Sequence, residues 1–187
     1  MAQGRSACHK KKAAEVGAKV VFEDEVCFQQ EGTSRQSWAR RGIGFIVKHH
    51  PCKRRSKFFG AISLEAAPGF VFQKANWFNS RTYEKFLAEI LNRFGKVVLI
   101  VDNVMYHRAK RLKAFLETNK DRLWLFNLPP YSPELNPVEL VWRETKKNAS
   151  HNRYFPTKKG LTRAVMSRFK MYQDLPSMLS GIVAQYL

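Results

Sequence analysis

The segment Phe94-Gly95-Lys96-Val97-Val98-Leu99-Ile100-Val101-Asp102-Asn103 decides the fold class of this 187-residue chain. Its centre, residues 97–101, is an unbroken apolar run that is mostly β-branched, the pattern of a strand buried on both faces. Such strands belong to sheets that helices cover on both sides. Gly95 ends the preceding helical pattern, and Asp102 places a carboxylate at the carboxyl end of the strand, where functional groups gather in open α/β sheets.

The sequence on either side of this strand changes from a period of two to a period of 3.6. Alternation predicts strands at 19–28, 57–64 and 70–74, with a weaker one at 45–49. The longer period predicts helices from Asn79 or Ser80 to Gly95, and at 109–119, 136–147 and 157–172, with one more strand at 123–128. We therefore predict an α/β fold with a mixed five-stranded sheet, three antiparallel then two parallel strands, and helices on both faces.

The charge of the chain indicates the kind of partner it meets. Lys and Arg number 33 against 15 Asp and Glu, which gives a net charge of +18 and an isoelectric point near 10.1. A surplus of this size favours a polyanion, with nucleic acid as the first candidate and an anionic membrane surface as the second. No apolar run approaches the ~20 residues of a transmembrane helix. The three cysteines form no CxxC pair, which indicates a reduced, intracellular protein without a zinc site.

Asp24 is unusual, because strands are depleted in aspartate. By strand parity it shares a face with Phe22 and Val26, where a carboxylate is costly unless it is paired or bound to a metal. A salt bridge to one of the many cationic side chains would equally explain it. Glu23 and Glu25 fall on the opposite face, and we interpret them as ordinary charged positions, with Glu25 close enough to assist.

Two further carboxylates have both a functional and a structural interpretation. Asp102 ends the buried strand, but together with Asn103 it also suits a turn or a helix N-cap. Glu139 is the third residue of the helix that Asn136 caps, so it could instead close a capping box. Glu134 lies in the loop before that helix and is the competing carboxylate, for which a solvated side chain is the default.

Three carboxylates on separate elements, Asp24, Asp102 and Glu139, can converge at one edge of the sheet. Oxygen-rich sites of this kind suit Mg²⁺ or Mn²⁺. Two such ions activate an attacking oxygen and stabilise a leaving one in phosphoryl transfer. With a net charge of +18, the pattern indicates metal-dependent chemistry on a nucleic-acid backbone.

These motifs resemble the catalytic domain of insertion-sequence transposases of the Tc/mariner superfamily, which are DDE transposases with a ribonuclease-H-like fold. The resemblance covers roughly residues 17–170. It rests on Phe22-Glu23-Asp24-Glu25, on Val101-Asp102-Asn103 with His107, on Pro129-Pro130-Tyr131-Ser132-Pro133-Glu134-Leu135-Asn136-Pro137-Val138-Glu139 with Trp142, and on Trp38 with Gly42. The 36 residues between Asp102 and Glu139 lie within the range of the family, and Glu134 fits less well.

The resemblance implies that Asp24, Asp102 and Glu139 are catalytic and hold two Mg²⁺ or Mn²⁺ ions. Water hydrolyses a phosphodiester at the transposon end, and the freed 3′-hydroxyl then attacks target DNA, at TA dinucleotides in this family. Candidates to support the carboxylates or to contact DNA are Glu25, Asn103 and His107. His107 could equally face solvent at a helix start, and Ser132 is interpreted as a loop cap rather than a nucleophile.

The basic residues form one group in the early loops and another near the C-terminal helices. Charge runs are usually solvated faces, but the surplus here favours contact with the phosphate backbone. Trp38 and Trp77 can stack on bases, with packing within the protein as the alternative for each. The candidate DNA-binding residues are Arg35, Trp38, Arg40, Arg41, Lys53, Arg54, Arg55, Lys146 and Lys147.

We expect a basic N-terminal arm at 1–18, a DDE catalytic domain at 19–175 and a C-terminal tail at 176–187. The family carries an N-terminal helix-turn-helix region that reads transposon ends, and no recognition helix fits before residue 19. We therefore expect a catalytic domain on its own, one product of a split reading frame, or a truncated remnant. The expected partner is DNA, with homodimers usual in the family, in the nucleoid of a prokaryotic cytoplasm and away from membranes. The alternatives are another ribonuclease-H-like nuclease and an inactive DNA-binding remnant.

Overall fold

A computed structural model describes residues 11–31, 33–36, 38, 40–42, 46, 48, 51–103, 109–130 and 132–187. Five strands form one sheet in the order β3-β2-β1-β4-β5. The strands are β1 (Lys19–Gln29), β2 (Arg55–Ser63), β3 (Phe70–Ala75), β4 (Val97–Val101) and β5 (Leu123–Asn127). The pairs β1–β2 and β2–β3 are antiparallel, whereas β1–β4 and β4–β5 are parallel. This confirms the predicted mixed sheet.

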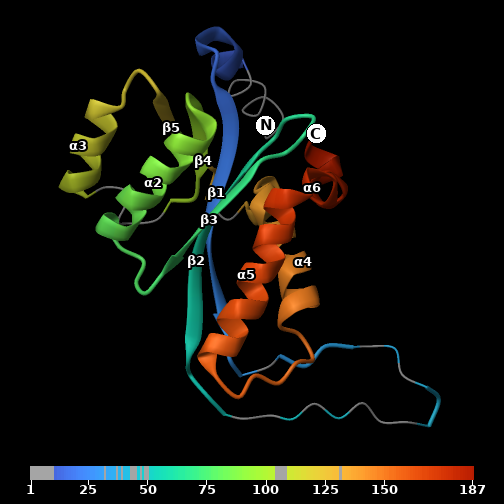
Figure 1. The fold of residues 1–187 in the computed structure, drawn as a ribbon. Helices are drawn as coiled ribbons and strands as arrows, with labels where there is room; N and C mark the ends of the chain where they lie inside the picture. The colour runs from blue at the N-terminus through green and yellow to red at the C-terminus, as the bar shows by residue number, and fades with distance from the viewer. Residues whose placement is uncertain are drawn as a thin grey trace.

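Helices cover both faces of the sheet, as predicted (Figure 1). One face carries α2 (Ser80–Phe94) and α3 (Lys110–Thr118), and the other carries α4 (Pro137–Ala149), α5 (Lys158–Asp174) and α6 (Pro176–Val183). Two short 3-10 helices, η2 (Pro133–Leu135) and η3 (Ala184–Tyr186), precede α4 and follow α6. Across the described part of the chain, no helix has the length and apolar character needed to cross a membrane.

The central strand β1 is buried on both faces, because it has a hydrophobic core on each side. Phe22 and Phe28 belong to the core under α4, α5 and α6, whereas Val21 belongs to the core under α2. Ring packing is dense in the first core, where Phe58 and Phe169 meet edge to face with centroids 5.3 Å apart. Full burial of each such side chain contributes roughly 1.5–3 kcal/mol, which fixes the helices on the sheet.

The residues at the helix ends explain where the elements begin and stop. Asn79 caps α2, and its side chain and that of Thr82 form a reciprocal capping box. Gly95 ends the same helix with a φ of 80°, a left-handed value that favours glycine. These ends agree with the sequence prediction. The predicted weak strand at 45–49 falls mostly outside the described residues, and the two described residues in it, Ile46 and Lys48, are not in a strand.

The predicted C-terminal tail, residues 176–187, contains α6 and η3. Leu179 and Val183 of α6 are fully buried in the core that they share with α4 and α5. The hydrophobic core therefore extends past residue 175. The sequence pattern does not predict α6, because two buried residues over eight positions are too few to establish a helical period.

Candidate active site

The register of the two parallel strands at the centre of the sheet brings two carboxylates side by side. The pairing of β1 with β4 aligns Phe22 with Ile100. Continued by two residues, the same register sets Asp24 opposite Asp102, on strands that lie about 4.8 Å apart. Because alternate residues share a face, Asp24 lies with Phe22 on the face that α4 covers, and Asp102 directly follows the last residue of β4.

The first turn of α4 carries Glu139 and is anchored to β1 through Asn136. The Asn136 carboxamide accepts a hydrogen bond from Val138 N at 3.2 Å and donates one to the carbonyl of Glu23 at 3.4 Å. The backbone N–H of Asn136 donates to the carbonyl of Pro133, so Glu139 does not close a capping box there. Glu139 is instead exposed.

Asp24 lies under the start of α4 with only 8% of its surface exposed. Burial raises the pKa of Asp24 to about 7, and repulsion from Glu139 and, more weakly, from Asp102 adds to the shift. Burial also raises the pKa of Asp102. Glu139 and Asp102 are thus each close enough to Asp24 to act on it. No cationic side chain among the described residues pairs with Asp24, so the structure does not support a salt bridge as its explanation.

The partner of Asp24 is instead the indole of Trp142, whose Nε1–H donates to Asp24 Oδ2 at 2.9 Å. Trp142 is 1% exposed, and its ring lies against Gly60, the residue that pairs with Asp24 across β1 and β2. This hydrogen bond favours the charged form of the carboxylate and so lowers the pKa of Asp24. Sequence analysis gave Trp142 no role, although its spacing of three from Glu139 places the two on adjoining sides of one helix.

Glu23 and Glu25 are not ordinary charged positions, and that interpretation is wrong. Glu23 is 1% exposed and accepts a hydrogen bond from the hydroxyl of Tyr83, on α2, at 3.1 Å. Burial raises the pKa of Glu23 well above its usual range, with repulsion from Glu25 and Asp24 adding to the shift. Burial likewise raises the pKa of Glu25 to about 8, together with repulsion from Asp24 and Asp102. The second face of β1 is therefore a second buried acidic environment.

The chemistry of Asp24, Asp102 and Glu139 fits a divalent cation. Their carboxylates repel one another, and within the described ranges no Lys or Arg ion pair neutralises Asp24, Asp102 or Glu139. On the opposite face of β1, the Oε1 atoms of Glu23 and Glu25 are also buried without a hydrogen-bond partner. Carboxylate oxygens are the ligands that Mg²⁺ and Mn²⁺ prefer. In the described part of the chain, no three side chains are already arranged as a metal site.

Asn103, Ser132 and Glu134 form hydrogen bonds within or between the loops near the site. The Asn103 amide donates to the carbonyl of Leu128 at 2.9 Å, which joins the ends of β4 and β5. Ser132 donates to the carbonyl of Pro130 within its own loop. Glu134 is exposed, and its carbonyl accepts a hydrogen bond from the hydroxyl of Tyr186. His107 lies outside the described residues.

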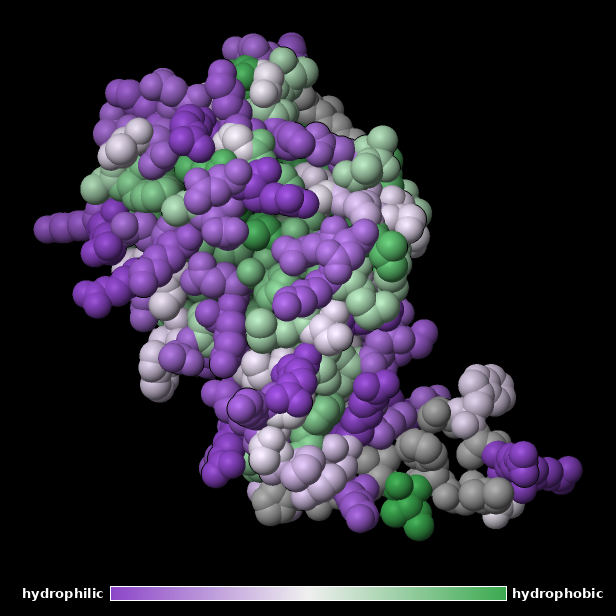
Figure 2. All heavy atoms as spheres, viewed as in Figure 1, coloured by the Kyte–Doolittle hydropathy of each residue, from purple (hydrophilic) through white to green (hydrophobic). Residues whose placement is uncertain are grey.

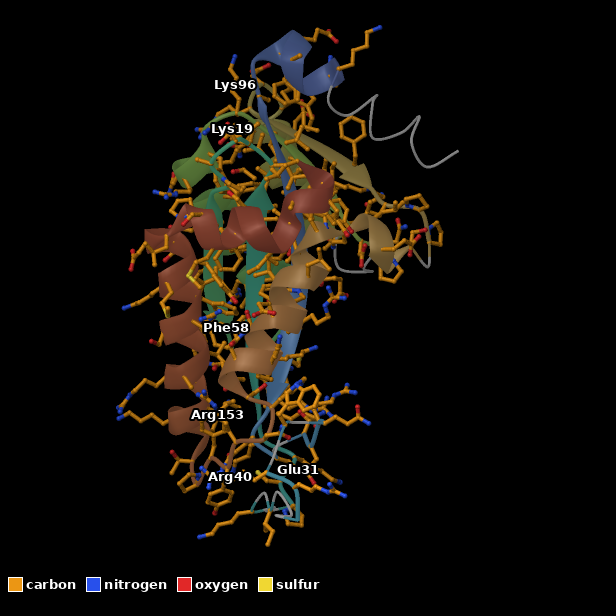
Figure 3. All side chains as sticks on the ribbon, turned by 90° about the vertical axis from the view of Figure 1, so that its right-hand side faces the viewer. Lys19, Glu31, Arg40, Phe58, Lys96 and Arg153 are labelled. Atoms are coloured by element: carbon orange, nitrogen blue, oxygen red, sulfur yellow. The ribbon has the colours of Figure 1, made fainter. Side chains whose placement is uncertain are left out.

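The predicted DNA-binding residues are at the surface. Hydrophilic side chains cover most of the face shown in Figure 2. Arg40 and Arg153 lie at the opposite end of the molecule from Lys19 and Lys96 (Figure 3). Lys146 is half-buried, and the described exposed candidates are Arg35, Trp38, Arg40, Arg41, Lys53, Arg54, Arg55 and Lys147.

The two tryptophans considered for stacking are not packed inside the protein. Trp38 is fully exposed, and Trp77 is 70% exposed with Lys57 Nζ 4.9 Å from its ring centroid. The packing alternative is therefore wrong for both. An exposed aromatic ring beside cationic side chains is compatible with stacking on a base.

The chain is similar to known proteins in sequence and in fold. Over 80 residues it is 38% identical to the uncharacterized protein y4pE/y4sA of Sinorhizobium fredii (strain NBRC 101917 / NGR234), a match that covers 41% of this chain and 56% of that protein. The Mos1 transposase paired-end complex with left transposon end matches with a TM-score of 0.60 and 16% identity, over 95% of this chain and 59% of the Mos1 chain. The Mos1 catalytic domain, solved with raltegravir and Mn, matches with a TM-score of 0.52 and 16% identity, over 95% and 87%.

The chain thus spans less than two thirds of the Mos1 chain in that complex and of the Sinorhizobium protein. The likeness to Mos1 transposase confirms the predicted ribonuclease-H-like fold. Residues 19–162, most of the chain, match the model of the DDE superfamily endonuclease family. The matched range includes Asp24, Asp102 and Glu139. The chain belongs to the DDE superfamily endonuclease family.

Proposed function

We propose that this chain is the catalytic domain of a DNA transposase, with Asp24, Asp102 and Glu139 as its catalytic residues. The observation that carries the proposal is the β1–β4 pairing, which brings the end of β4, directly before Asp102, next to the part of β1 that precedes Asp24, with Glu139 acting on Asp24 from α4. The reaction is hydrolysis of a phosphodiester at a transposon end, followed by attack of the freed 3′-hydroxyl on target DNA. Membership of the DDE superfamily endonuclease family supports the assignment.

The three carboxylates are proposed to hold two Mg²⁺ or Mn²⁺ ions, which activate the attacking oxygen and stabilise the leaving oxygen when bound. Mos1 complexes solved with Mn and with Mg support this choice of ions. Trp142 orients Asp24 through its N–H, and Asn136 holds the first turn of α4 against β1. Trp142 and Asn136 thus hold Asp24 and Glu139 in position, although these two carboxylates repel each other.

The proposed partner is DNA, both transposon ends and target. The net charge of +18 and the exposed cationic residues support binding to the phosphate backbone. The resemblance to the Tc/mariner superfamily supports a TA target, a homodimer, action together with an N-terminal helix-turn-helix region, and a place in the prokaryotic nucleoid. The Mos1 structures include a paired-end complex and a strand transfer complex, which is consistent with this set of partners.

Nicking of a supercoiled plasmid in Mn²⁺ tests the catalytic assignment. We expect the chain to nick the plasmid and Asp102→Asn to lose the activity by at least a hundredfold, a loss typical of removing one catalytic group. Glu134→Gln is the matched control, because it removes an exposed carboxylate five residues before Glu139. Equal activity of Asp102→Asn and the wild type would contradict the assignment.

A second assay separates a transposase from other outcomes. An oligonucleotide with a recessed 3′-hydroxyl end is mixed with plasmid, and joined products are sought. Joined products identify a strand transferase, whereas cutting without joining identifies another ribonuclease-H-like nuclease. Binding of DNA with neither cutting nor joining, and without carboxylate-dependent uptake of Mn²⁺, identifies an inactive DNA-binding remnant.

A further inference from the structure

A small cavity lies where β1, the chain just after it and the end of α4 come together. Its volume is about 190 Å³, which is below the ~300–1,000 Å³ of sites for drug-sized molecules and suits a single small group. Two cations and two hydroxyls line it, and none of the described lining residues is acidic. The polar groups come from Thr33, Arg35, Lys146 and Ser150, with Cys27 and Phe28 of β1 forming part of the wall.

Asn152 builds this cavity by fixing the chain after β1 to the end of α4. Its side chain forms a pair of hydrogen bonds with the backbone of Arg35, accepting from Arg35 N at 2.8 Å and donating to Arg35 O at 3.0 Å. Its own N–H donates to the carbonyl of Thr33 at 3.1 Å. Asn152 is also the one non-glycine residue of the described chain with positive φ, at 55°. A residue keeps such a backbone conformation when surrounding contacts fix it, and here the hydrogen bonds between Asn152 and Arg35 do so.

The electrostatic environment of the cavity is positive. His151 lies beside it, and burial lowers the pKa of His151, with repulsion from Arg35 and Lys146 adding to the shift. Both cations are therefore close to the same point in space. A concave site with two converging cations and hydroxyl donors has the chemistry of a phosphate site.

The cavity also has a defined position relative to the carboxylates. Glu139 and Lys146 are seven residues apart on α4, which is about two helical turns or roughly 10 Å. At about 3.4 Å of axial rise per nucleotide of a DNA strand, that distance corresponds to roughly three nucleotides. A strand that runs along α4 from the carboxylates reaches this cavity.

We infer that the cavity formed by Thr33, Arg35, Lys146 and Ser150 binds one backbone phosphate of a DNA strand, roughly three nucleotides from the phosphodiester at the carboxylates. The inference rests on the proposed function, since it takes DNA as the substrate. It adds a specific subsite that sets how far the strand is advanced into the active site. Arg35 and Lys146 supply the charge, and Asn152 is a positioning residue for Arg35.

The test measures the affinity for a fluorescein-labelled 30-base-pair duplex in EDTA as a function of KCl concentration. Arg35→Gln with Lys146→Gln removes two charges from the cavity. Arg93→Gln with Lys96→Gln removes two exposed charges, from the last turn of α2 and from the residue before β4, away from the cavity, and leaves the net charge equal to that of the first variant. Asn152→Gly keeps the total charge and tolerates the positive φ, but loses both hydrogen bonds to Arg35.

We expect the cavity variant to lower the slope of log affinity against log salt by nearly two, because each phosphate contact contributes about 0.9. Between 50 and 200 mM KCl the loss of affinity is then roughly tenfold smaller than in the wild type. We expect Asn152→Gly to lower the slope by about one and the Arg93/Lys96 variant to change it by less than one half. Near-ultraviolet circular dichroism of each variant checks that the fold is retained.

Equal slopes for the cavity variant and the Arg93/Lys96 variant would overturn the inference while leaving DNA binding intact. A wild-type slope in Asn152→Gly would overturn the positioning role. If the wild-type chain does not bind the duplex at 50 mM KCl, the proposed function and the inference that rests on it both fail. A second readout is the alkylation rate of Cys27 in a Cys8→Ser, Cys52→Ser background. Saturating duplex must slow alkylation, and an unchanged rate contradicts occupancy of the cavity.

Discussion

The ring of Trp142 covers the backbone of Gly60 so closely that a Cβ on Gly60 would lie 2.2 Å from Cη2 of the indole. Gly60 is paired with Asp24 across the antiparallel strands, and the same indole donates a hydrogen bond to the Asp24 carboxylate. The missing side chain of Gly60 thus makes the room that lets Trp142 reach Asp24. One small residue, one large residue and one carboxylate form a single packing unit at the centre of the site.

Substitution Gly60→Ala is expected to destabilise the fold by about 1–3 kcal/mol, because the buried indole cannot move aside without disturbing the core. The free energy of unfolding is measured by urea denaturation. Gly181→Ala is the matched control, since a Cβ there meets no atom within 4 Å and the residue is in α6. The control is expected to be neutral or slightly stabilising. Equal stability of the two variants would show that the indole is not held as described.

Substitution Trp142→Phe removes the N–H that favours the charged form of Asp24 and keeps an aromatic ring in the core. The pKa of Asp24 then rises, and the acidic limb of the pH profile of nicking moves to higher pH. A hydrogen bond to a charged group contributes about 1.5–3 kcal/mol, so nicking near neutral pH is expected to fall roughly tenfold or more. The difference in nicking activity between Trp142→Phe and the wild type must become smaller as pH increases. Trp77→Phe, at an exposed ring, must leave the profile in place.

Stability without metal is expected to fall as pH rises from about 4 to about 8. The pKa values of Asp24 and Glu25 are about 7 and about 8 in the fold, against about 3.9 and 4.3 in an unfolded chain. In this window the native state binds more protons than the unfolded state, so the free energy of unfolding decreases with increasing pH. The melting temperature, measured in EDTA from pH 4 to pH 9, follows this loss.

Two further measurements separate the buried carboxylates from general charge effects. Glu25→Gln must flatten the pH dependence and raise the melting temperature at pH 8, whereas Glu117→Gln, at an exposed salt bridge with Lys120, must leave it unchanged. Saturating Mn²⁺ at pH 8 must stabilise the wild-type chain by mass action. A melting temperature that is flat from pH 4 to pH 8 in EDTA would mean that these carboxylates are not buried as the structure shows.

Substitution Asn136→Ala is expected to separate placement of Glu139 from helix stability. It removes an N-cap, which costs about 1 kcal/mol, and also the hydrogen bond from α4 to the backbone of β1. Thr157→Ala removes the cap of α5 alone, where the side chain accepts from Gly160 N. Asn136→Ala should lose about 1 kcal/mol more stability than Thr157→Ala, because it also loses the hydrogen bond to β1, and only Asn136→Ala should lose nicking activity by tenfold or more. Parallel losses of activity would contradict a specific role for Asn136.

Residue periodicity was sufficient to predict the sheet and most helices, because β1, α2 and β4 are long or strongly patterned. Periodicity was insufficient to predict that Glu23 and Glu25 are buried. Parity assigns them correctly to the face opposite Asp24, but it does not show how deeply that face is buried around these two residues. The parallel partner β4 and helix α2 bury it, and neither contact is local in sequence.

In the candidate site, local sequence patterns predicted the carboxylates but not the side chains that contact them. Asp24, Asp102 and Glu139 were singled out from strand parity, strand ends and motif spacing. The contacts of Trp142 with Asp24 and of Asn136 with Glu23 span 118 and 113 residues of sequence. Such pairs are set by how α4 packs on the sheet, which no local pattern encodes.

The hydroxyl of Tyr186 donates to the carbonyl of Glu134, in the short helix just before the one that carries Glu139. Residue 24 lies near the other end of the chain, so the parts that surround the carboxylates are drawn from almost its whole length. Assembly of this part of the fold therefore depends on contacts between segments that are distant in sequence, and local folding alone cannot complete it.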